Sequence, residues 1–488
     1  MAALADSAAR CSPDADATHR HVGDPMEAAL HVLAAKAGVP APPPVLDRTA
    51  FDPRRRRASV IDRDGLHVVG APDAVLPLCR AVPEDAHDQV VALSARGLRL
   101  LAVARTADPE RGERDLDLLG LVALEDPPRD DVADAIAACR RAGIRVGMVT
   151  GDHPGTALAI AREVGLAVPG APVVVGADLP ADDAALAALV DRDGVVVARV
   201  APEDKLRIAR ALQSRGHVVA MTGDGVNDGP ALRAADIGVA MGASGTDVAR
   251  EAADLVLLDD HFGTIVAAVE LGRATFANIR RFLTYHLTDN VAELAPFALW
   301  ALSGGQVPLA ITVLQVLAID IGTDLLPALA LGAEPANPRT LDGPARRGEL
   351  LDRSVLRRAF GLLGPVQALG AVAAFLTVLW AGGWGFGDTV DPALVATASG
   401  AAFAAIVLGQ VGTAFACRSA SRWAGWRGNP ALLAAIAVEL VVLAVFLYVP
   451  PMPELLGGTG PTALGWALAA AVPALVVAAD LVAKAVRR

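Results

Sequence analysis

The pattern of apolar and polar positions along the chain changes near residue 270. Before that point, short apolar runs of strand length alternate with stretches whose apolar residues recur at helical spacing. After it come six apolar segments that are each long enough to cross a lipid bilayer. They run over residues 277–302, 307–333, 358–382, 391–416, 430–450 and 461–485. The pattern predicts α/β domains followed by an all-α transmembrane bundle of six helices.

The part before residue 270 divides again near residue 118. Residues 20–118 mix helical patches with short strands, and the Asp-Gly punctuation within 57–71 predicts a hairpin. From there onward, beginning with a strand over 118–126, strands alternate with helices, which is typical of a parallel sheet with crossover helices. We therefore predict three domains, which span residues 1–118, 119–272 and 273–488.

The basic residues predict how the six segments cross the membrane. They gather at the start of the first segment, between the second and third and between the fourth and fifth segments, and at the chain end: Arg280, Arg281, Arg346, Arg347, Arg353, Arg357, Arg358, Arg418, Arg422, Arg427, Lys484, Arg487 and Arg488. The three remaining loops contain no lysine or arginine. Because short loops rich in basic residues stay on the cytoplasmic side, we predict a multi-pass protein of the cell membrane. Its soluble domains and C-terminus would lie in the cytoplasm.

Composition argues against several classes of function. The net charge of −11, without interleaved basic and aromatic residues, argues against a nucleic-acid partner. The four cysteines lie far apart and form no CxxC, so we expect neither a disulfide framework nor a common zinc site. No signal peptide is evident in the first twenty residues. Lysine occurs only at Lys36, Lys205 and Lys484, so a lysine inside a motif is informative.

The strongest chemical signal is the string MTGDGVNDGPAL, which follows an apolar strand. Its Asp224 and Asp228, four residues apart on a glycine-rich turn, can place oxygen ligands on Mg²⁺. Asn227 adds an amide that can orient a phosphoryl oxygen. Thr150 in VTGD and Lys205 in APEDK could neutralise charge on a transferring phosphoryl group. Haloacid-dehalogenase-like phosphotransferases use this set in this order at the carboxyl ends of strands.

Seven strings then stand in one order along the chain: GDPMEAAL, FDPRRRRASV, GAPDAVL, LEDPPR, VTGD, ARVAPEDK and TGDGVNDGPALRAADIGVAMGASGTDVAREAADLVLLDDHF. With them, the chain resembles the P-type ATPases over essentially its whole length. The resemblance implies a haloacid-dehalogenase-like, Rossmann-like α/β phosphorylation domain and a partial α+β nucleotide-binding domain. It also implies ATP and Mg²⁺ as cofactors, with Phe51 stacked on adenine and Asp224 holding Mg²⁺ in front of Asp228. The implied ATP-contacting set is Glu27, Phe51, Arg56, Arg99, Asp126, Arg129, Thr150, Gly151, Asp152, Arg199 and Lys205.

Two departures from the family pattern qualify this reading. The lysine that precedes GAP in the family's nucleotide pocket is Val69 here, and Arg56 could compensate for the lost charge. The family's phosphorylated aspartate, in DKTGT, does not occur, nor do the TGE-bearing actuator domain and four preceding spans. We expect this chain to be a C-terminal half whose partner is a separate N-terminal half, because a phosphoenzyme needs that aspartate as its nucleophile.

The first two predicted spans carry polar groups, which are costly in a bilayer and usually functional. Asn290 and Glu293 lie three residues apart, and Asp320 and Asp324 lie four apart with Thr323 beside them. A proline in each span lacks an N–H and frees a nearby carbonyl oxygen. Such an oxygen cage suits hard cations rather than copper or soft heavy metals. The alternative is a set of inter-helix hydrogen bonds that lock the bundle.

Six spans after the catalytic domain resemble the type II pumps. The strings LTDNVAELAPF and IDIGTDLLPALALGAEPANP look closest to the sodium/potassium and proton/potassium branch, and calcium pumps remain similar. By this resemblance Gln410 and Glu439 add ligands for the transported cation. Asp289 stands where relatives commonly have serine, and it offers a further carboxylate that leaves the choice of ion open. Asp480 is expected to be a solvated partner of Lys484.

We therefore expect ATP-driven transport of a hard cation such as Na⁺, K⁺, H⁺ or Ca²⁺ across a lipid bilayer. A second hypothesis is a non-catalytic membrane remnant or regulatory partner of a full-length pump. A membrane-tethered phosphatase is disfavoured, because its nucleophile does not occur either.

Overall fold

The computed structural model describes residues 1–12, 25–40, 43–125, 127–168, 170–345, 348–419 and 428–486. Contacts divide the chain into two compact units, Met1–Ala267 and Ala268–Arg488. The first unit holds the strands, which form three sheets, and the second is helical. The finer division of the first unit at residue 118 stays a prediction.

The first sheet is mostly antiparallel. Its six strands run in the order β1 (Asp47–Asp52), β2 (Arg57–Asp62), β3 (Gly65–Gly70), β5 (Arg99–Thr106), β6 (Leu116–Leu124) and β4 (Cys79–Ala81). The predicted hairpin is confirmed, because β2 and β3 pair antiparallel up to Asp62 and Gly65. The strand predicted over 118–126 also forms, but as β6 it pairs antiparallel with β5 and so belongs to this sheet. Its expected place in the parallel sheet was wrong, because strand pairing depends on long-range partners that local pattern does not specify.

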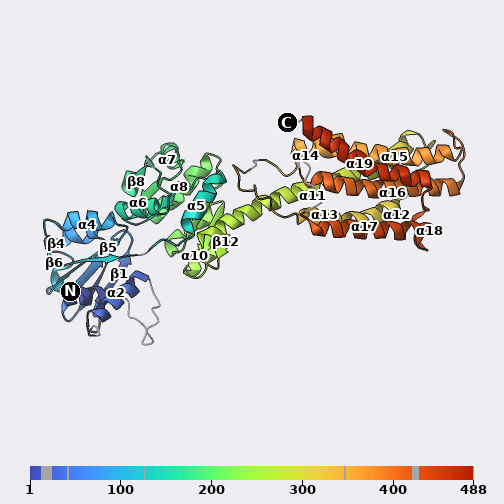
Figure 1. Cartoon of the computed structure of the whole chain (residues 1–488). Helices are drawn as coiled ribbons and strands as arrows, with labels where there is room; N and C mark the ends of the chain where they lie inside the picture. Colours follow the sequence, from blue (N-terminus) through green and yellow to red (C-terminus); the bar gives the residue numbers. More distant parts are fainter. Residues whose placement is uncertain are drawn as a thin grey trace. The chain divides into compact units, whose positions relative to one another are not determined.

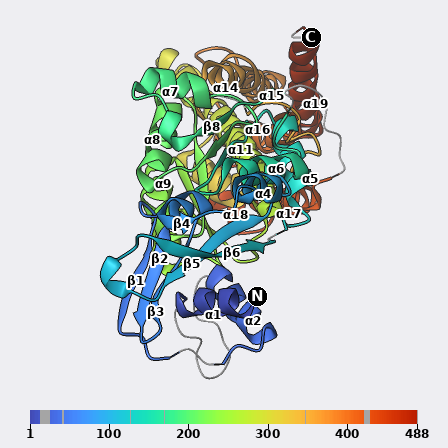
Figure 2. The ribbon, with the colours of Figure 1, turned by 90° about the vertical axis from the view of Figure 1, so that its left-hand side faces the viewer.

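Alternate residues of this sheet face two different helical layers. Val69 and Val103 pack in the cluster that includes α1 and α2, whereas Val68 and Ala102 pack with α3 and η1 on the opposite face. Figure 2 shows α1 and α2 side by side against the sheet. The helices of this part are α1 (Ala2–Arg10), α2 (Pro25–Lys36), α3 (Pro72–Val75), η1 (Leu76–Leu78), α4 (Ala86–Ser94) and η2 (Pro109–Arg111).

The parallel strands form two sheets of three rather than the single sheet that we predicted. One sheet has the order β7 (Met148–Val149), β9 (Val196–Ala198) and β8 (Val173–Val175), and the other has β10 (Ala220–Gly223), β11 (Ile237–Met241) and β12 (Leu255–Leu257). Among the described residues, no strand joins β7 to β10, so each is an edge strand. Their helices are α5 (Val132–Arg141), α6 (Pro154–Glu163), η3 (Gly176–Asp178), α7 (Asp183–Val190), α8 (Pro202–Ser214), η4 (Val226–Asp228), α9 (Gly229–Ala234) and α10 (Asp247–Ala252).

The second unit begins within the long helix α11, which Figure 1 shows with the other helices of this unit. These helices are α11 (Phe262–Leu302), α12 (Val313–Ala318), the π-helical turn η5 (Ile319–Asp324), α13 (Leu325–Gly332), α14 (Arg353–Arg358), the π-helical turn η6 (Ala359–Leu363), α15 (Gly364–Ala381), α16 (Pro392–Cys417), α17 (Pro430–Tyr448), α18 (Met452–Leu456) and α19 (Ala463–Val486).

Five helices in the described part of the chain are long and apolar enough to cross a membrane. They span Val313–Gly332, Arg353–Ala381, Pro392–Cys417, Pro430–Tyr448 and Ala463–Val486. The first predicted segment, 277–302, is helical within α11 but is not among the helices that are apolar enough to span a membrane. The predicted count of six spans is therefore corrected to five candidate spans among the described residues. The physical reason is that the carboxylates, amide and histidine of this segment lower its mean hydropathy.

The core of the second unit lies where α15, α16 and α19 pack side by side (Figure 1). Small residues allow this close approach: a Cβ at Gly412 would lie 2.7 Å from the Cα of Pro473 on α19. The basic residues Arg346, Arg347, Arg422, Arg427, Arg487 and Arg488, which we used for the orientation, lie outside the described residues.

Candidate phosphoryl-transfer and cation sites

Thr150 and Asp152 follow β7 at the carboxyl end of one parallel sheet. The Thr150 N–H donates to the carbonyl of Val197 on β9 at 2.9 Å, which fixes the start of the turn. The Thr150 hydroxyl donates to Asp152 Oδ2 at 3.0 Å, and Arg99 of β5 donates to the same oxygen at 3.2 Å. The structure thus brings together three residues of the predicted ATP-contacting set.

Lys205 and Asp228 connect the turns that follow the two parallel sheets. Lys205 lies in the first turn of α8, after β9, and its Nζ donates to Asp228 Oδ1 at 2.6 Å. The N–H of Gly225 donates to Asp228 Oδ2 at 3.2 Å, so both carboxylate oxygens are engaged. A side chain at Gly223 would collide with Asp228, which explains the glycine at this position. Asp228 is therefore a buried, paired carboxylate.

Asp224 and Asn227 lie on the same turn as Asp228 but are exposed. The carbonyl of Asp224 accepts from the N–H of Thr246 at 2.8 Å, which holds the backbone in place. Within the described ranges, neither the Asp224 carboxylate nor the Asn227 amide has a hydrogen-bond or ion-pair partner. These two groups are free to meet a ligand in water.

Two arginines of the predicted ATP-contacting set hold Asp73, a residue that the sequence analysis did not single out. Arg56 donates to Asp73 Oδ2 at 2.6 Å, and Arg199 donates to Asp73 Oδ1 at 2.9 Å. Both arginines have positive φ, 53° and 55°, which is costly for a residue with a side chain. Burial lowers the pKa of Arg199, and the charge of Asp73 opposes that shift. The available signal for Asp73 was its place in the GAPDAVL string.

Arg129 approaches a second carboxylate that sequence reasoning missed, with 3.9 Å between its Nη2 and Asp260 Oδ2. Burial alone would raise the pKa of Asp260, but hydrogen bonds from Ser244 and the N–H of Ala243 lower it below its ordinary range. Asp126, another residue of the predicted ATP-contacting set, lies outside the described residues.

The remaining predicted nucleotide contacts are less concentrated. Phe51 on β1 is 57% exposed, Glu27 lies in the first turn of α2, and Gly151 is exposed in the turn after β7. Val69 is buried in the cluster that contains Ala8 of α1. The side chain at position 69 therefore faces the protein core rather than a ligand.

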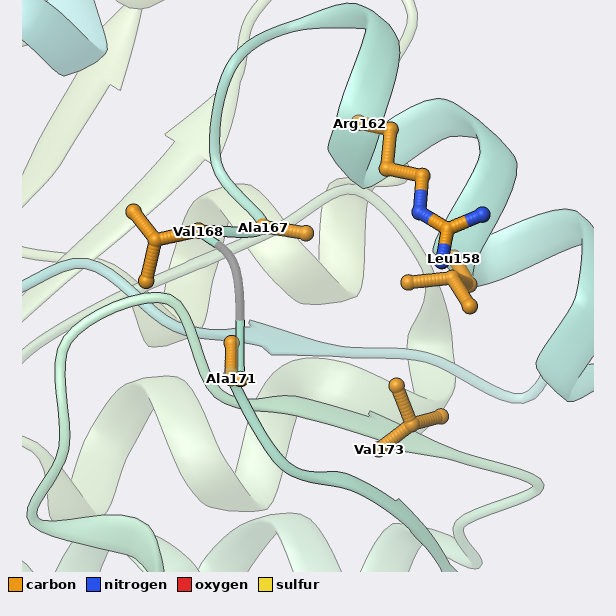
Figure 3. Close-up of a pocket in the computed structure, with 7 residues that line it drawn as sticks. Leu158, Arg162, Ala167, Val168, Ala171 and Val173 are labelled. Carbon is orange, nitrogen blue, oxygen red and sulfur yellow. The ribbon is translucent and has the colours of Figure 1, made fainter.

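A pocket of about 410 Å³ lies beside α6 and β8 (Figure 3). Its labelled lining is apolar except for Arg162, whose side chain comes from α6. None of the predicted catalytic residues lines it. We assign it no part in the chemistry.

In the second unit, four buried acidic side chains each have at least one carboxylate oxygen with no hydrogen-bond partner among the described residues. Asp289 and Glu293 lie four residues apart on α11, Asp324 ends η5 and Glu439 lies on α17; each is at most 4% exposed. Asp289 Oδ2, Glu293 Oε1, Asp324 Oδ1 and both oxygens of Glu439 have no hydrogen-bond partner among the described residues. Their charges act on one another. Unsatisfied carboxylates in such a place are costly unless a cation or protons compensate them.

Neutral oxygen donors accompany these acids. Thr323 donates to Gln410 Oε1 at 3.1 Å, which brings two of the predicted cation ligands together. Gln367 of α15 donates to Asp289 Oδ1 at 3.1 Å and accepts from Thr413 at 2.8 Å. Sequence reasoning missed Gln367, although it is a lone amide inside an apolar segment, which is a usable signal.

Two predicted cation ligands lie outside this buried group. Asn290 is exposed, because its neighbour Asp289 shares a helix face with Glu293 instead. Asp320 is also exposed, although it is four residues before Asp324. The reason is η5: a π-helical turn closes with i→i+5 bonds, so residues four apart no longer stand in line. His286 instead meets Asp324, with 2.9 Å between Nδ1 and Oδ2.

No three His, Cys, Asp or Glu side chains of the described residues converge as a ready metal site. Among these residues, Asp224 and Asp228 therefore have no third such side chain beside them. The described acids of the second unit do not form such a group either. Cys11, Cys79, Cys139 and Cys417 are free thiols.

Comparisons with known proteins give one family match in each unit. A family model described as "Cation transporting ATPase, C-terminus" matches residues 308–486, and one described as "haloacid dehalogenase-like hydrolase" matches residues 27–236. The "Probable cation-transporting ATPase F" of Mycobacterium bovis is 38% identical over 98% of this chain and 57% of its own length. A "Calcium-transporting ATPase" of Bacillus subtilis is 35% identical over 95% of this chain and 55% of its own length.

Both units are therefore similar to P-type cation-transporting ATPases. A "Sodium/potassium-transporting ATPase subunit alpha-2" of Rattus norvegicus is 40% identical over 54% of this chain and 28% of its own length. The chain spans between half and three-fifths of the length of the first two relatives.

Buried ion pairs connect the helices at one end of the helical bundle. Asp480 is 2% exposed and pairs with Lys484 and with Arg358, whose Nη2 lies 2.7 Å from Asp480 Oδ1. The expectation of a solvated Asp480 was wrong, because α14 and α19 enclose it. Arg418 makes a second buried pair with Glu334, at 2.6 Å. Unlike the acids on α11, these carboxylates have cationic partners from the protein itself.

Proposed function

We propose that this chain supplies the cation site and part of the phosphoryl-transfer site of an ATP-driven pump. The proposal rests on buried carboxylate oxygens of Asp289, Glu293, Asp324 and Glu439 that have no hydrogen-bond partner among the described residues. In a bilayer, such oxygens need a cation or protons. A site that alternately gains and loses its ion is what a pump requires.

The chemistry of the donors favours a hard cation such as Na⁺, K⁺, H⁺ or Ca²⁺. Carboxylates, the Gln410 amide and the Thr323 hydroxyl are all oxygen donors. Oxygen ligands select hard cations, whereas soft metals prefer thiolates and thioethers. The buried Asp289 takes the place that we had expected Asn290 to fill.

The turn after β10 fits Mg²⁺, which prefers oxygen ligands and keeps several waters. The exposed carboxylate of Asp224 and amide of Asn227 are available, while Asp228 is held by Lys205. When bound, Mg²⁺ would neutralise charge on a transferring phosphoryl group. ATP would meet Arg99, Asp152 and Thr150 on one side of this turn. The contact of Phe51 with adenine stays a prediction.

The nucleophilic aspartate would come from an N-terminal segment that carries DKTGT, with an actuator domain and four further spans. Two edge strands support this part of the proposal. Thr150 follows β7 and Asp224 follows β10, yet each of these strands pairs on one side only among the described residues. Ala220 and Thr222 of β10 are exposed, whereas Val239 and Ala240 of β11 are buried. Parallel strands are normally covered on both faces, so these strands can accept a further strand.

The pump would lie in the cell membrane with its first unit and its C-terminus in the cytoplasm. The described basic residues at the helix ends, such as Arg353, Arg357 and Arg418, support this orientation through the positive-inside rule.

Acid-stable phosphorylation from labelled ATP tests the proposal. The full chain would be expressed alone and together with an N-terminal segment carrying DKTGT, and assayed in Na⁺, K⁺, Ca²⁺ and at several pH values. We expect a phosphoenzyme only when the chain and the N-terminal segment are expressed together. We also expect one of these ions to change the amount of phosphoenzyme.

Lys205→Ala should strongly reduce that phosphoenzyme, while Lys36→Ala, an exposed lysine on α2, should leave it unchanged. A combination that forms no phosphoenzyme in any of these ions contradicts the proposal. So does equal labelling of the two lysine variants.

A further inference from the structure

A cavity of about 650 Å³ lies inside the second unit, apart from the acidic residues described above. Its walls come from the first half of α11, the segment after α13, the start of α14 and the end of α16. Arginines line it on several sides: Arg273, Arg280, Arg281, Arg339 and Arg358. Asp342 is the one carboxylate among its lining residues. The cavity therefore carries a strong excess of positive charge.

Protein contacts position these arginines without neutralising all of them. Arg280 is held by Asp352 at 2.8 Å, and Arg358 by Asp480. Arg281 donates to the amide oxygen of Asn278, which is neutral. Among the described residues, Arg281 and Arg339 form no ion pair with a carboxylate. Their charge is available to a ligand.

The fixed pairs also rigidify the cavity wall. The Asp352 carboxylate caps α14 by accepting from Ser354 and from the N–H of Val355. The hydrogen bond from Ser354, with those from Val355 and Arg280, lowers the pKa of Asp352 well below its usual range. Asp352 therefore stays ionised at neutral pH and keeps Arg280 at the cavity. A preorganised wall binds with less loss of side-chain freedom.

The depth of the cavity indicates the source of its ligand. Arg358 lies in the opening turns of the candidate span Arg353–Ala381, and Cys417 is the last residue of the span Pro392–Cys417. The wall thus lies where two candidate spans end, at the level of the lipid headgroups. Arginine guanidinium groups match phosphate oxygens in two-point hydrogen bonds. The volume is also in the range of small-ligand sites.

We propose that this arginine-lined cavity binds the phosphate of an anionic phospholipid headgroup. The ligand would sit between α11 and α14 and would contact Arg281 and Arg339. Because α11 carries Asp289 and Glu293 further along the same helix, the lipid would brace the helix that bears two of the buried acids. This site is separate from the proposed transport function and can fail or hold independently of it.

Lipid titration of the full chain in neutral detergent tests the proposal, with thermal unfolding and native mass spectrometry as readouts. The probes are short-chain phosphatidylglycerol, short-chain phosphatidylcholine and inorganic phosphate. We expect saturable stabilisation and a bound adduct with phosphatidylglycerol alone. Equal binding of the two lipids overturns the proposal. Equal effects of inorganic phosphate and phosphatidylglycerol would assign the cavity to a free phosphate and overturn the lipid source.

Two variants with the same change in charge locate the effect. Arg281→Gln with Arg339→Gln should weaken phosphatidylglycerol binding about tenfold or more, since each basic group near an anionic headgroup is worth about 1 kcal/mol. Arg353→Gln with Arg357→Gln changes two exposed arginines of α14 that do not line the cavity, and should have little effect. Equal losses in both pairs would mean diffuse attraction and contradict a built site. Arg339→Gln alone changes an exposed residue and should not disturb folding, so a loss of binding in this variant cannot be explained by misfolding. We expect this variant to weaken binding.

Discussion

The polar groups of the two candidate sites are satisfied in opposite ways. In the first unit, Lys205 neutralises Asp228, while Asp224 stands in water. In the second unit, both carboxylate oxygens of Glu439 and one of Asp324 are buried with no hydrogen-bond partner among the described residues. In the first site, a lysine or water satisfies each carboxylate even when no ligand is bound. The second is electrostatically incomplete until an ion or protons arrive.

This difference follows from the two solvents. Water can satisfy a carboxylate at the end of a parallel strand, so the phosphoryl-transfer turn costs little when empty. A bilayer offers no such partners, so the acids of the second unit are retained only if they serve an ion.

Breaking a buried pair that does have its partner should be the most damaging change in the second unit. Arg418→Ala removes the cationic partner of the largely buried Glu334 and leaves it only the Asn429 amide as a donor among the described residues, so we expect a loss of about 3–5 kcal/mol in unfolding free energy. Arg353→Ala removes an exposed arginine and should cost under about 0.5 kcal/mol. Thermal unfolding of the two variants in detergent compares them. Equal stabilities would show that the buried pair is not structural.

Glu439→Gln should separate stability without a cation from stability with one. An amide removes the partnerless charge, so the variant should be at least as stable as the parent in the absence of the cation. The parent should gain about 2.7 kcal/mol at a hundredfold excess of cation over Kd, and the variant should gain nothing. Unfolding curves with and without each cation measure both quantities. A full gain in the variant contradicts a role for Glu439.

Lys205→Met tests the paired carboxylate of the first unit. The change leaves Asp228 without its cationic partner, and we expect a loss of about 2 kcal/mol. Lys36→Met provides the matched control at an exposed position and should change little. Denaturant unfolding of the full chain gives both values. A loss as small as that of the control would place the ion pair among weak surface pairs.

Asp224→Asn should have the smallest effect on stability, below about 0.5 kcal/mol, because its carboxylate is exposed and has no described partner. It should nevertheless remove Mg²⁺-dependent phosphorylation in the reconstituted pump. Melting temperature and phosphoenzyme level, measured on the same preparation, check the two parts. A large loss of stability would mean that Asp224 has a structural role.

The sequence predicted the elements better than their partners. The hairpin of β2 and β3, the helix α8 behind Lys205 and five of the six long apolar helices follow from local patterns. The separation of the parallel strands into two sheets does not, since it depends on which strand edges meet. Helix α1 was missed, because its short alanine-rich sequence gains its stability from packing against the first sheet.

The candidate sites show the same limit at the level of single residues. The string around Asp224, with Thr150 and Lys205, is specific enough to be read directly. In the second unit, adjacent positions on α11 differ by about a quarter turn, so pattern alone could not choose Asp289 over Asn290. The π-helical turn that separates Asp320 from Asp324 is likewise a result of packing.

Equilibrium cation binding to the detergent-solubilised chain tests whether the buried acids of the second unit hold a cation. Labelled Na⁺, K⁺ and Ca²⁺ would each be measured on the parent, on Asp324→Asn and on the matched Asp320→Asn variant. We predict saturable binding of at least one cation to the parent, loss of that binding in Asp324→Asn, and retention in Asp320→Asn, whose carboxylate lies on the exposed side. Absence of saturable binding to the parent, or equal binding to Asp324→Asn, would contradict the account.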